Sequence, residues 1–329
     1  MNSLSNYQTI AIIGTAKNAG KTTALNALLA KMKHKQIAIT SIGLDGEKID
    51  QLTKQEKPSI HAYKGMYVAT AKDTLGMITS PYQILEDYPI QTPLGPIVLV
   101  EMLEDGDVLL AGPSSLHELR RLKDSLSKYH CDHFFIDGAL FRKSSAASHL
   151  ADAMILSTGA SLHKNMKRVI QDTKILVETI SLTQKDLPKI KKTKLVLENN
   201  QVMYDQGTFL SKPSDLLSHA EHAKELHISG AMTNRLIEDL IANKDRIPSL
   251  EIILNDFTMI HADLDLFQKL YLLKHRVKLI NQTPLLLLTI NPTSPYFEGF
   301  DPQLFEEAMK DALPNTPIID IKRKELPYE

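Results

Sequence analysis

The segment Gly14–Thr23 (GTAKNAGKTT) lies between a short apolar run and a helical pattern, and it constrains the fold more than any other part of the chain. The run before it, Thr9–Gly14, is almost continuously apolar, as is typical of a strand buried on both faces. The stretch after it, Lys21–Lys33, carries apolar residues at helical spacing. A glycine-containing turn between a strand and a helix N-terminus presents backbone N–H groups to an anion. We therefore expect a phosphate-binding loop near the start of the chain.

Apolar runs and helical patterns alternate along most of the remaining sequence. Further strands are expected at Gln36–Gly43, Met66–Thr70, Ile97–Met102, Val108–Ala111, His133–Ile136, Met154–Ser157, His227–Ser229, Glu251–Leu254, Val277–Ile280, Leu285–Ile290 and Ile318–Ile321. Helices are expected at Ser115–Tyr129, Leu162–Glu178, Asn234–Ala242, Leu264–Lys274 and Pro302–Leu313. This order predicts an α/β fold, a doubly wound and mostly parallel sheet with a P-loop NTPase core, plus a smaller α/β C-terminal portion.

The expected domain organisation has three parts. Residues 1–184 would form the P-loop NTPase domain, 185–225 a connector and hairpin, and 226–329 the C-terminal α/β portion. Within the connector, Leu195–Leu210 reads as a hairpin with its turn at Asn199-Asn200. The polar stretch Asp45–Gly65 is expected to be a long surface excursion. Whether the last third is a second domain or extends the first sheet is left open by the sequence.

Composition and charge exclude several classes of function. The formal net charge of −1 provides no strong attraction to nucleic acid or to an anionic membrane, so neither is an expected partner. The longest apolar stretch, Leu285–Ile290, is too short to span a bilayer. The single cysteine, Cys131, allows neither an internal disulfide nor a thiolate zinc site, and it is expected to be buried. Together with a start that does not resemble a signal peptide, these features predict a cytoplasmic protein.

The phosphate loop suggests a role for each of its residues. The nucleotide-binding set is predicted to be Thr15, Lys17, Asn18, Ala19, Gly20, Lys21, Thr22, Thr23 and Gly138. Lys21 would reach the β- and γ-phosphates, and the Thr22 hydroxyl would coordinate Mg²⁺. The nucleotide is expected to be ATP, with GTP not excluded, because the only trace of a guanine-reading motif, Thr183–Asp186, is attributed to chance.

Two acidic residues follow apolar runs, where open α/β sheets place their ligand sites. Asp137, in HFFIDG, is the predicted acid for a magnesium-bound water, and Gly138 would allow a close approach to the γ-phosphate. Asp45, in SIGLDGE, would hold magnesium or the attacking water, with Glu47 a weaker candidate. The predicted catalytic set is therefore Lys21, Asp45 and Asp137, and the predicted metal set is Thr22, Asp45 and Asp137. For Arg142 and Lys143 the sequence leaves open whether they contact the nucleotide or a partner protein.

The spacing of the loop narrows the class of P-loop. Five residues separate Gly14 from Gly20, and the pattern G-T-x-x-x-x-G-K-T resembles the loop of dethiobiotin synthetase and its relatives in the SIMIBI branch. Some members of that branch carry a signature lysine that contacts a neighbouring subunit's phosphates. Lys17 is one place away from that position, so that role is not assigned to it. A homodimer is plausible for this branch.

A closer resemblance rests on several further segments. They are TSIGLDGE (Thr40–Glu47), VATAKDTL (Val68–Leu75), TPLGPI (Thr92–Ile97), AGPSS (Ala111–Ser115), IDGALFRKSSAAS (Ile136–Ser148) and ILSTGASLHKNM (Ile155–Met166). Together these resemble the P-loop subunit of the reactivating factor for lysine 5,6-aminomutase, an enzyme of lysine fermentation that uses adenosylcobalamin and pyridoxal phosphate. The resemblance covers roughly the first 170 residues, with Leu44 in place of the family's usual Arg.

The resemblance implies a nucleotide-driven reactivase, or chaperone, that acts with a MutS-like ATPase subunit to open the aminomutase for cofactor exchange. It implies that Asp45–Lys57 and Leu140–Ser148 move with the nucleotide state. The alternative is an ATP-dependent ligase or kinase of the dethiobiotin synthetase type, for which Lys48 and Lys72 could bind a substrate acid. A third possibility, a metallochaperone GTPase, is disfavoured because the chain has a single cysteine.

Overall fold

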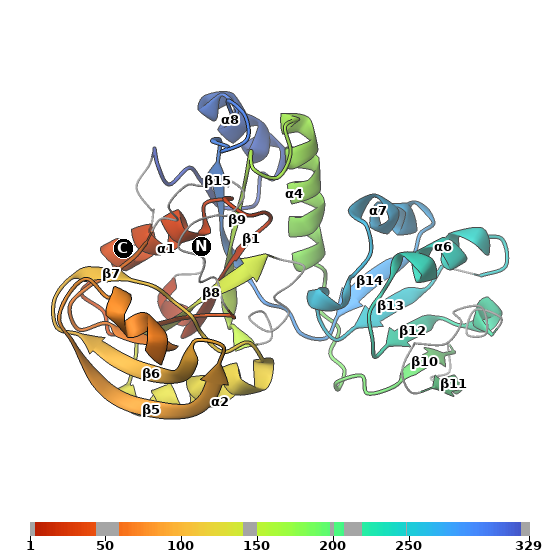
Figure 1. Ribbon diagram of the computed structural model, residues 1–329. Coiled ribbons are helices and arrows are strands. Elements are labelled where there is room, and N and C mark those ends of the chain that lie inside the picture. The colour runs from red at the N-terminus through yellow and green to blue at the C-terminus, as the bar shows by residue number, and fades with distance from the viewer. Residues whose placement is uncertain are drawn as a thin grey trace. The chain divides into compact units, whose positions relative to one another are not determined.

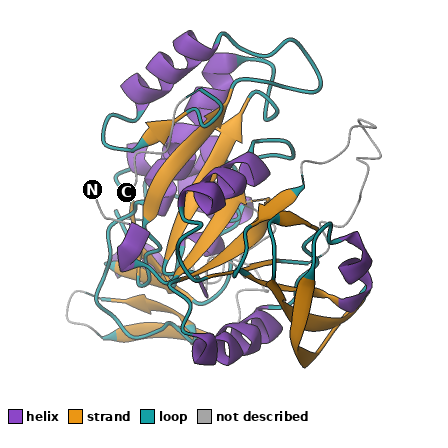
Figure 2. Ribbon diagram, turned by 90° about the vertical axis from the view of Figure 1, so that its left-hand side faces the viewer, coloured by secondary structure: helices purple, strands orange, loops and turns teal. Residues whose placement is uncertain are grey.

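The chain forms two compact units, each built around its own β-sheet (Figure 1). The computed structural model describes residues 4–43, 59–140, 150–197, 201–206, 219–247 and 249–323. The first unit comprises Met1–Thr173 and Thr283–Glu329, and the second comprises Lys174–Gln282. Helices and strands, purple and orange in Figure 2, alternate along most of the chain. The α/β class and the mostly parallel pairing are as expected.

The sheet of the first unit has nine strands in the order β16-β15-β9-β1-β8-β2-β4-β6-β5. Its strands are β1 (Thr9–Gly14), β2 (Ile37–Ser41), β4 (Tyr67–Ala71), β5 (Tyr82–Thr92), β6 (Gly95–Met102), β8 (His133–Leu140), β9 (Ala153–Gly159), β15 (Leu285–Asn291) and β16 (Ile318–Ile319). From β16 to β4 each strand is parallel to its neighbour. Strand β6 pairs antiparallel with both β4 and β5. The carboxyl ends of the parallel strands therefore share one edge of the sheet.

Helices and short elements complete the first unit. They are η1 (Leu4–Asn6), α1 (Lys21–Lys31), η2 (Lys72–Met77), α2 (Leu116–Leu126), η3 (Ser127–Tyr129), α8 (Pro302–Ala312) and the antiparallel pair β3 (Ile60–Ala62) and β7 (Gly106–Val108). Helix α4 (Met166–Ile180) carries the chain into the second unit. Helix α2 begins with Ser115 as its N-cap, because Ser115 Oγ accepts from the backbone N–H of Glu118 at 3.2 Å and also donates to the Glu118 carboxylate at 2.9 Å.

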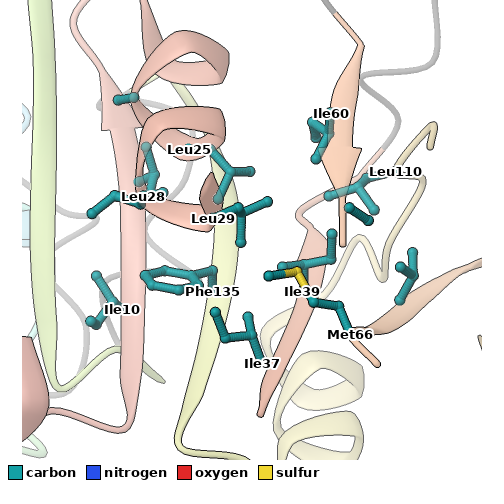
Figure 3. Close-up of a cluster of buried hydrophobic side chains, with 14 of the residues drawn as sticks. Ile10, Leu25, Leu28, Leu29, Ile37, Ile39, Ile60, Met66, Leu110 and Phe135 are labelled. Carbon is teal, nitrogen blue, oxygen red and sulfur yellow. The ribbon is translucent and has the colours of Figure 1, made fainter. Parts of the chain in front are cut away.

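The core explains why these strands are central. Every residue of β1, β2 and β9 is buried, so helices or loops cover both faces of the sheet. On one face, Ile10, Ile37, Ile39 and Phe135 pack against α1, whose Leu25, Leu28 and Leu29 point down onto the strands (Figure 3). These three leucines recur at the i, i+3 and i+4 positions of one helical face. The packing holds the start of α1 over the carboxyl end of β1.

The second unit has five strands in the order β11-β10-β12-β13-β14. Its elements are β10 (Thr193–Val196), β11 (Val202–Gln206), η4 (Ala220–His222), β12 (Glu225–Ile228), α6 (Asn234–Ala242), β13 (Glu251–Leu254), η5 (Phe257–Met259), α7 (Leu264–Leu272) and β14 (Arg276–Leu279). Strands β12, β13 and β14 are parallel, and the hairpin β10–β11 joins them antiparallel. The predicted hairpin is thus present, with its turn at 198–200 outside the described residues.

The division of the chain differs from the expected one. The hairpin in 185–225 is not a connector, because β10 pairs with β12 and so belongs to the sheet of the second unit. The expected C-terminal portion, 226–329, is split between the units. Strand β15 is a run of leucines buried by pairing with β9, so residues from Thr283 onward return to the first sheet and extend it.

Two strands were not expected. Ile60–Ala62 lies inside the stretch predicted as a surface excursion, yet it forms β3 because Ser59 and His61 both bond to the Asp107 carboxylate, each at 2.8 Å, beside β7. Strand β5 gives no sequence signal because it is a largely exposed edge strand interrupted by Pro89. Proline is tolerated there because an edge strand leaves backbone N–H groups unpaired.

Candidate functional site

The loop after β1 contains two residues in the left-handed conformation before α1 begins. Asn18 has φ 62° and Gly20 has φ 101°, a region that glycine enters at little cost. The Ala24 N–H donates to the Gly20 carbonyl at 2.9 Å, which starts the helix. Gly20 has no side chain to cap the N–H groups of the first turn. A helix N-terminus without a side-chain cap is suited to receive an anion, because its dipole favours negative charge.

Lys21, the first residue of α1, folds back over this loop. A Cβ added to Gly14 would lie 2.9 Å from Lys21 Cγ, so the absence of a side chain at Gly14 makes room for the lysine stem. Lys21 Nζ donates to the Gly138 carbonyl at 2.6 Å and lies 3.9 Å from Asp137 Oδ1. The lysine and aspartate side chains are 12% and 6% exposed. Gly14, which is not in the predicted binding set, therefore has a steric reason to be glycine.

Asp137 and Gly138 lie inside β8 rather than after it, since the strand continues to Leu140. Asp137 is opposite Ile12 of β1 and Ser41 of β2, close to the carboxyl edge. The pairing of β1 with β8 shifts register between Ile12 and Gly14. Such irregularities re-aim backbone groups, and here the Gly138 carbonyl points to Lys21. The structure thus brings the predicted Lys21, Asp137 and Gly138 together.

The other predicted loop residues lie around the same turn. Ala19 is buried, Asn18 is exposed, and Lys17, Thr22 and Thr23 are half-buried. Thr15 is held by the neighbouring strand β9, because its N–H donates to the Ser157 carbonyl at 2.9 Å and its hydroxyl donates to Thr158 Oγ1 at 3.1 Å. Both donors of Thr15 therefore anchor the loop to β9, and a contact of Thr15 with phosphate would require one of these two bonds to be exchanged.

Several predictions fall outside the described residues. Asp45, Glu47 and Lys48 lie within 44–58, as does the departure Leu44. Arg142 and Lys143 lie within 141–149. These predictions, and the two segments expected to move with the nucleotide, stay predictions.

The carboxyl edge also contains residues that were not among the predicted site residues. Ser41 Oγ accepts from the Gly112 N–H at 3.0 Å, and a Cβ at Gly112 would lie 1.9 Å from the Ser41 carbonyl. Asn291, at the end of β15, donates from Nδ2 to the Asn18 carbonyl at 3.2 Å. A small cavity of about 10 Å³, room for one water molecule, lies between this asparagine and the loop. The sequence signal that could have selected Ser41 and Asn291 is a small polar residue at the end of a strand. That signal does not predict which residue each side chain contacts.

Other side chains considered from the sequence are engaged elsewhere. Lys72 pairs with Asp87 at 3.2 Å on an exposed surface. In the faint guanine-reading motif, Gln184 pairs with Leu279 and Lys185 bonds to Glu225, all within the second unit. Cys131 is buried as expected, and burial raises the pKa of its thiol to about 11. No helix among the described residues is long and apolar enough to cross a membrane.

Comparison with known proteins adds no relative. The chain matches no protein-family model, no curated protein and no solved structure.

The chemistry available at this edge follows from its charges and dipoles. One lysine ammonium, the uncapped start of a helix and a left-handed backbone turn lie together, and all three favour a bound anion. Asp137 and the Thr22 hydroxyl supply the hard oxygen atoms that Mg²⁺ prefers. Within 4–43, 59–140 and the other described ranges, no group of three His, Cys, Asp or Glu residues could hold a metal ion alone.

Proposed function

We propose that this protein binds a nucleoside triphosphate, with ATP favoured, at the carboxyl edge of the nine-stranded sheet and hydrolyses it. The observation that carries the proposal is the arrangement of Lys21 over Gly14, beside Asp137 and above the left-handed turn at Gly20. The Lys21 ammonium bonds to the Gly138 carbonyl. A triphosphate would offer the same ammonium a full anionic partner, which makes stronger hydrogen bonds than a neutral carbonyl does.

Magnesium fits the residues present. Thr22 is the second residue of α1, and Asp137 is a nearly buried carboxylate at the same edge. Mg²⁺ commonly takes one or two protein oxygens together with phosphate oxygens and waters, and bound there it would neutralise phosphate charge. Thr22 and Asp137 would hold the ion or its waters, and Asp45 remains a further predicted ligand.

The biological setting that we propose comes from the resemblance of the first 170 residues to the reactivating-factor subunit. On this proposal the chain is a cytoplasmic ATPase that works with a MutS-like ATPase subunit on a lysine 5,6-aminomutase. Nucleotide binding and release would order and free segments at the carboxyl edge, as in other nucleotide switches. Hydrolysis by the isolated chain is then expected to be slow and to rise when both partners are present.

The first experiment compares the wild-type chain with Lys21→Ala by calorimetry, using ATP and MgCl₂. Loss of the charge-assisted bonds of Lys21 should weaken binding by about 100-fold. A matched pair then tests the metal role. Thr22→Ala should reduce the gain in affinity that Mg²⁺ provides, whereas Thr233→Ala, at the N-cap of α6 with no side-chain cap bond, should not. A wild-type chain that binds no ATP, or a Lys21→Ala chain that binds it unchanged, would refute the nucleotide site.

A second experiment separates the reactivase from the small-molecule enzyme. The isolated chain is incubated with ATP and candidate carboxylic acids, and in parallel with the aminomutase and the MutS-like subunit. A hydrolysis rate that rises only with the proteins supports the reactivase. Rapid ATP turnover with a small acid, giving a new product, would instead support a dethiobiotin synthetase type of activity.

A further inference from the structure

Strand β15 reaches the phosphate loop from two strands away in the sheet. Its neighbour β9 lies between it and β1, yet the side chain of Asn291, at the end of β15, extends to the loop. Asn291 Nδ2 donates to the Asn18 carbonyl at 3.2 Å. A Cβ added to Gly20 would lie 3.4 Å from Asn291 Cβ, so the asparagine is also a neighbour of the second left-handed residue of the loop.

The amide of Asn291 is held in one orientation. Its Oδ1 accepts two hydrogen bonds from Thr293, one from the backbone N–H at 3.2 Å and one from the hydroxyl at 2.8 Å. Only an oxygen can accept from both donors, so the nitrogen must face the Asn18 carbonyl. An aspartate in this place would keep the acceptor and lose the donor.

The backbone of Asn291 is anchored as firmly as its side chain. The Ala160 N–H donates to the Asn291 carbonyl at 2.9 Å. A Cβ at Gly159 would lie 2.1 Å from that carbonyl oxygen, so only glycine allows β9 to come this close. The end of β15 is therefore a fixed point from which the Asn291 amide can hold the loop.

We infer that Asn291 is a positioning residue for the phosphate loop. By binding the Asn18 carbonyl, its amide keeps that peptide group turned to β15, so that Asn18 and Gly20 stay left-handed and the start of α1 remains open to an anion. This inference rests on the proposed nucleotide site. It gives the C-terminal segment, which has no phosphate-loop motif of its own, a role in ligand binding.

The test measures by calorimetry the affinity of the full chain for two ligands in the presence of MgCl₂. The ligands are ATP and inorganic tripolyphosphate, which has the phosphates without a base. Asn291→Ala and Asn291→Asp should each lower the affinity for both ligands by about 5- to 10-fold, because one hydrogen bond that orders the loop is lost. Thr293→Ala, which removes one bond that orients the amide, should weaken both ligands by a smaller factor and covers the case in which the Asn291 variants do not fold.

Three results would overturn the inference. Unchanged affinity in all variants means that Asn291 does not position the loop. Loss of ATP affinity alone, with tripolyphosphate unaffected, means that Asn291 contacts the base. Loss with Asp but not with Ala means that the added charge, and not the missing donor, is responsible. If Lys21→Ala abolishes binding while the Asn291 variants bind as wild type, the proposed nucleotide site stands and only this inference fails.

Discussion

The two units contain the same strand–loop–helix turn, and the two turns end differently. In the first unit β1 leads through the loop at 15–20 into α1, and in the second β12 leads through 229–233 into α6. The second loop contains a buried residue whose backbone groups are both hydrogen-bonded within the unit. Met232 is fully buried, its N–H donates to the Met259 carbonyl at 2.7 Å, and its carbonyl accepts from His261 at 2.9 Å. The backbone N–H and carbonyl of Met232 are therefore used to join this loop to η5 and to His261.

The first residue of each helix shows the same contrast. Lys21 of α1 extends over the loop to the carboxyl edge of its sheet. Asn234 of α6 instead bonds to the start of α7, because its Nδ2 donates to Asp263 Oδ2 at 2.7 Å and its Oδ1 accepts from the Asp263 N–H at 2.6 Å. The first side chain of α1 thus lies at the carboxyl edge of its sheet, whereas the first side chain of α6 joins two helices.

The two units also differ in where their partly buried ion pairs lie. On the sheet of the second unit Lys185 bonds to Glu225 and Glu251, and Lys278 bonds to Glu251 at 2.5 Å. His227 bonds to Glu225 at 2.7 Å. This paired cluster lies partly buried, so it is suited to holding the strands together. In the first unit a partly buried pair, Lys21 with Asp137, lies at the carboxyl edge of the sheet.

The largest expected effect tests whether the units are separate cores. Leu28→Ala in α1 and Leu236→Ala in α6 each remove a fully buried side chain and should each cost about 2–5 kcal/mol of stability. Hydrogen exchange measured by mass spectrometry should show faster exchange only in the unit that carries the substitution. The control Leu304→Ala, at a side chain that is 57% exposed, should change little. Faster exchange in both units from either leucine would mean a single cooperative core.

The next effect concerns the charged cluster. Glu251→Gln leaves Lys185 and Lys278 without their shared carboxylate and should destabilise the second unit by about 1–3 kcal/mol. Thermal unfolding at pH 7 measures this loss. Glu221→Gln, which breaks an exposed pair with Arg246, is the matched control and should have little effect.

The pH dependence of the second unit follows from the same cluster. Burial opposes ionisation of Glu225 and Glu251, but bonds from His227 and the lysines outweigh it and lower both pKa values. The unfolded state then binds more protons, so the stability from these groups is present above the unfolded pKa, near 4.3, and is lost as the pH falls through the folded values. Burial also lowers the pKa of His227, so the loss should begin below about pH 6.5. A flat profile between pH 7 and 4 would contradict this account.

The smallest effect separates loop geometry from general backbone strain. Gly20→Ala places a side chain at φ 101°, which should cost about 1–2 kcal/mol and lower ATP affinity about tenfold if the loop changes shape to relieve it. Gly65→Ala has the same kind of strain, at φ 83° with no atom within 4 Å of the added Cβ. It should lower the melting temperature without changing ATP affinity. Equal affinities in the two variants would mean that the left-handed turn at Gly20 does not shape the site.

Local pattern predicted much of the framework. Strands β1 and β13 and helix α6 have the bounds expected from their apolar residues, because each is buried through its own sequence period. The position of Lys21 at the start of α1 was likewise predictable from the strand, glycine and helix around it. Strand β5 was not, because many of its side chains are exposed, Pro89 interrupts it, and its pairing with β6 is a tertiary feature.

Residues near one another in the chain thus determined the α/β alternation, the glycine-containing loop between β1 and α1, and the selection of Lys21 and Asp137 as candidate site residues. The tertiary structure alone decided that the last segment returns to the first sheet, that β9 anchors Thr15, and that Asn291 contacts Asn18, 273 positions earlier in the chain. The physical reason is that backbone dihedral preferences and apolar periodicity act over a few residues. Strand order and side-chain contacts between distant strands depend on which buried surfaces fit together.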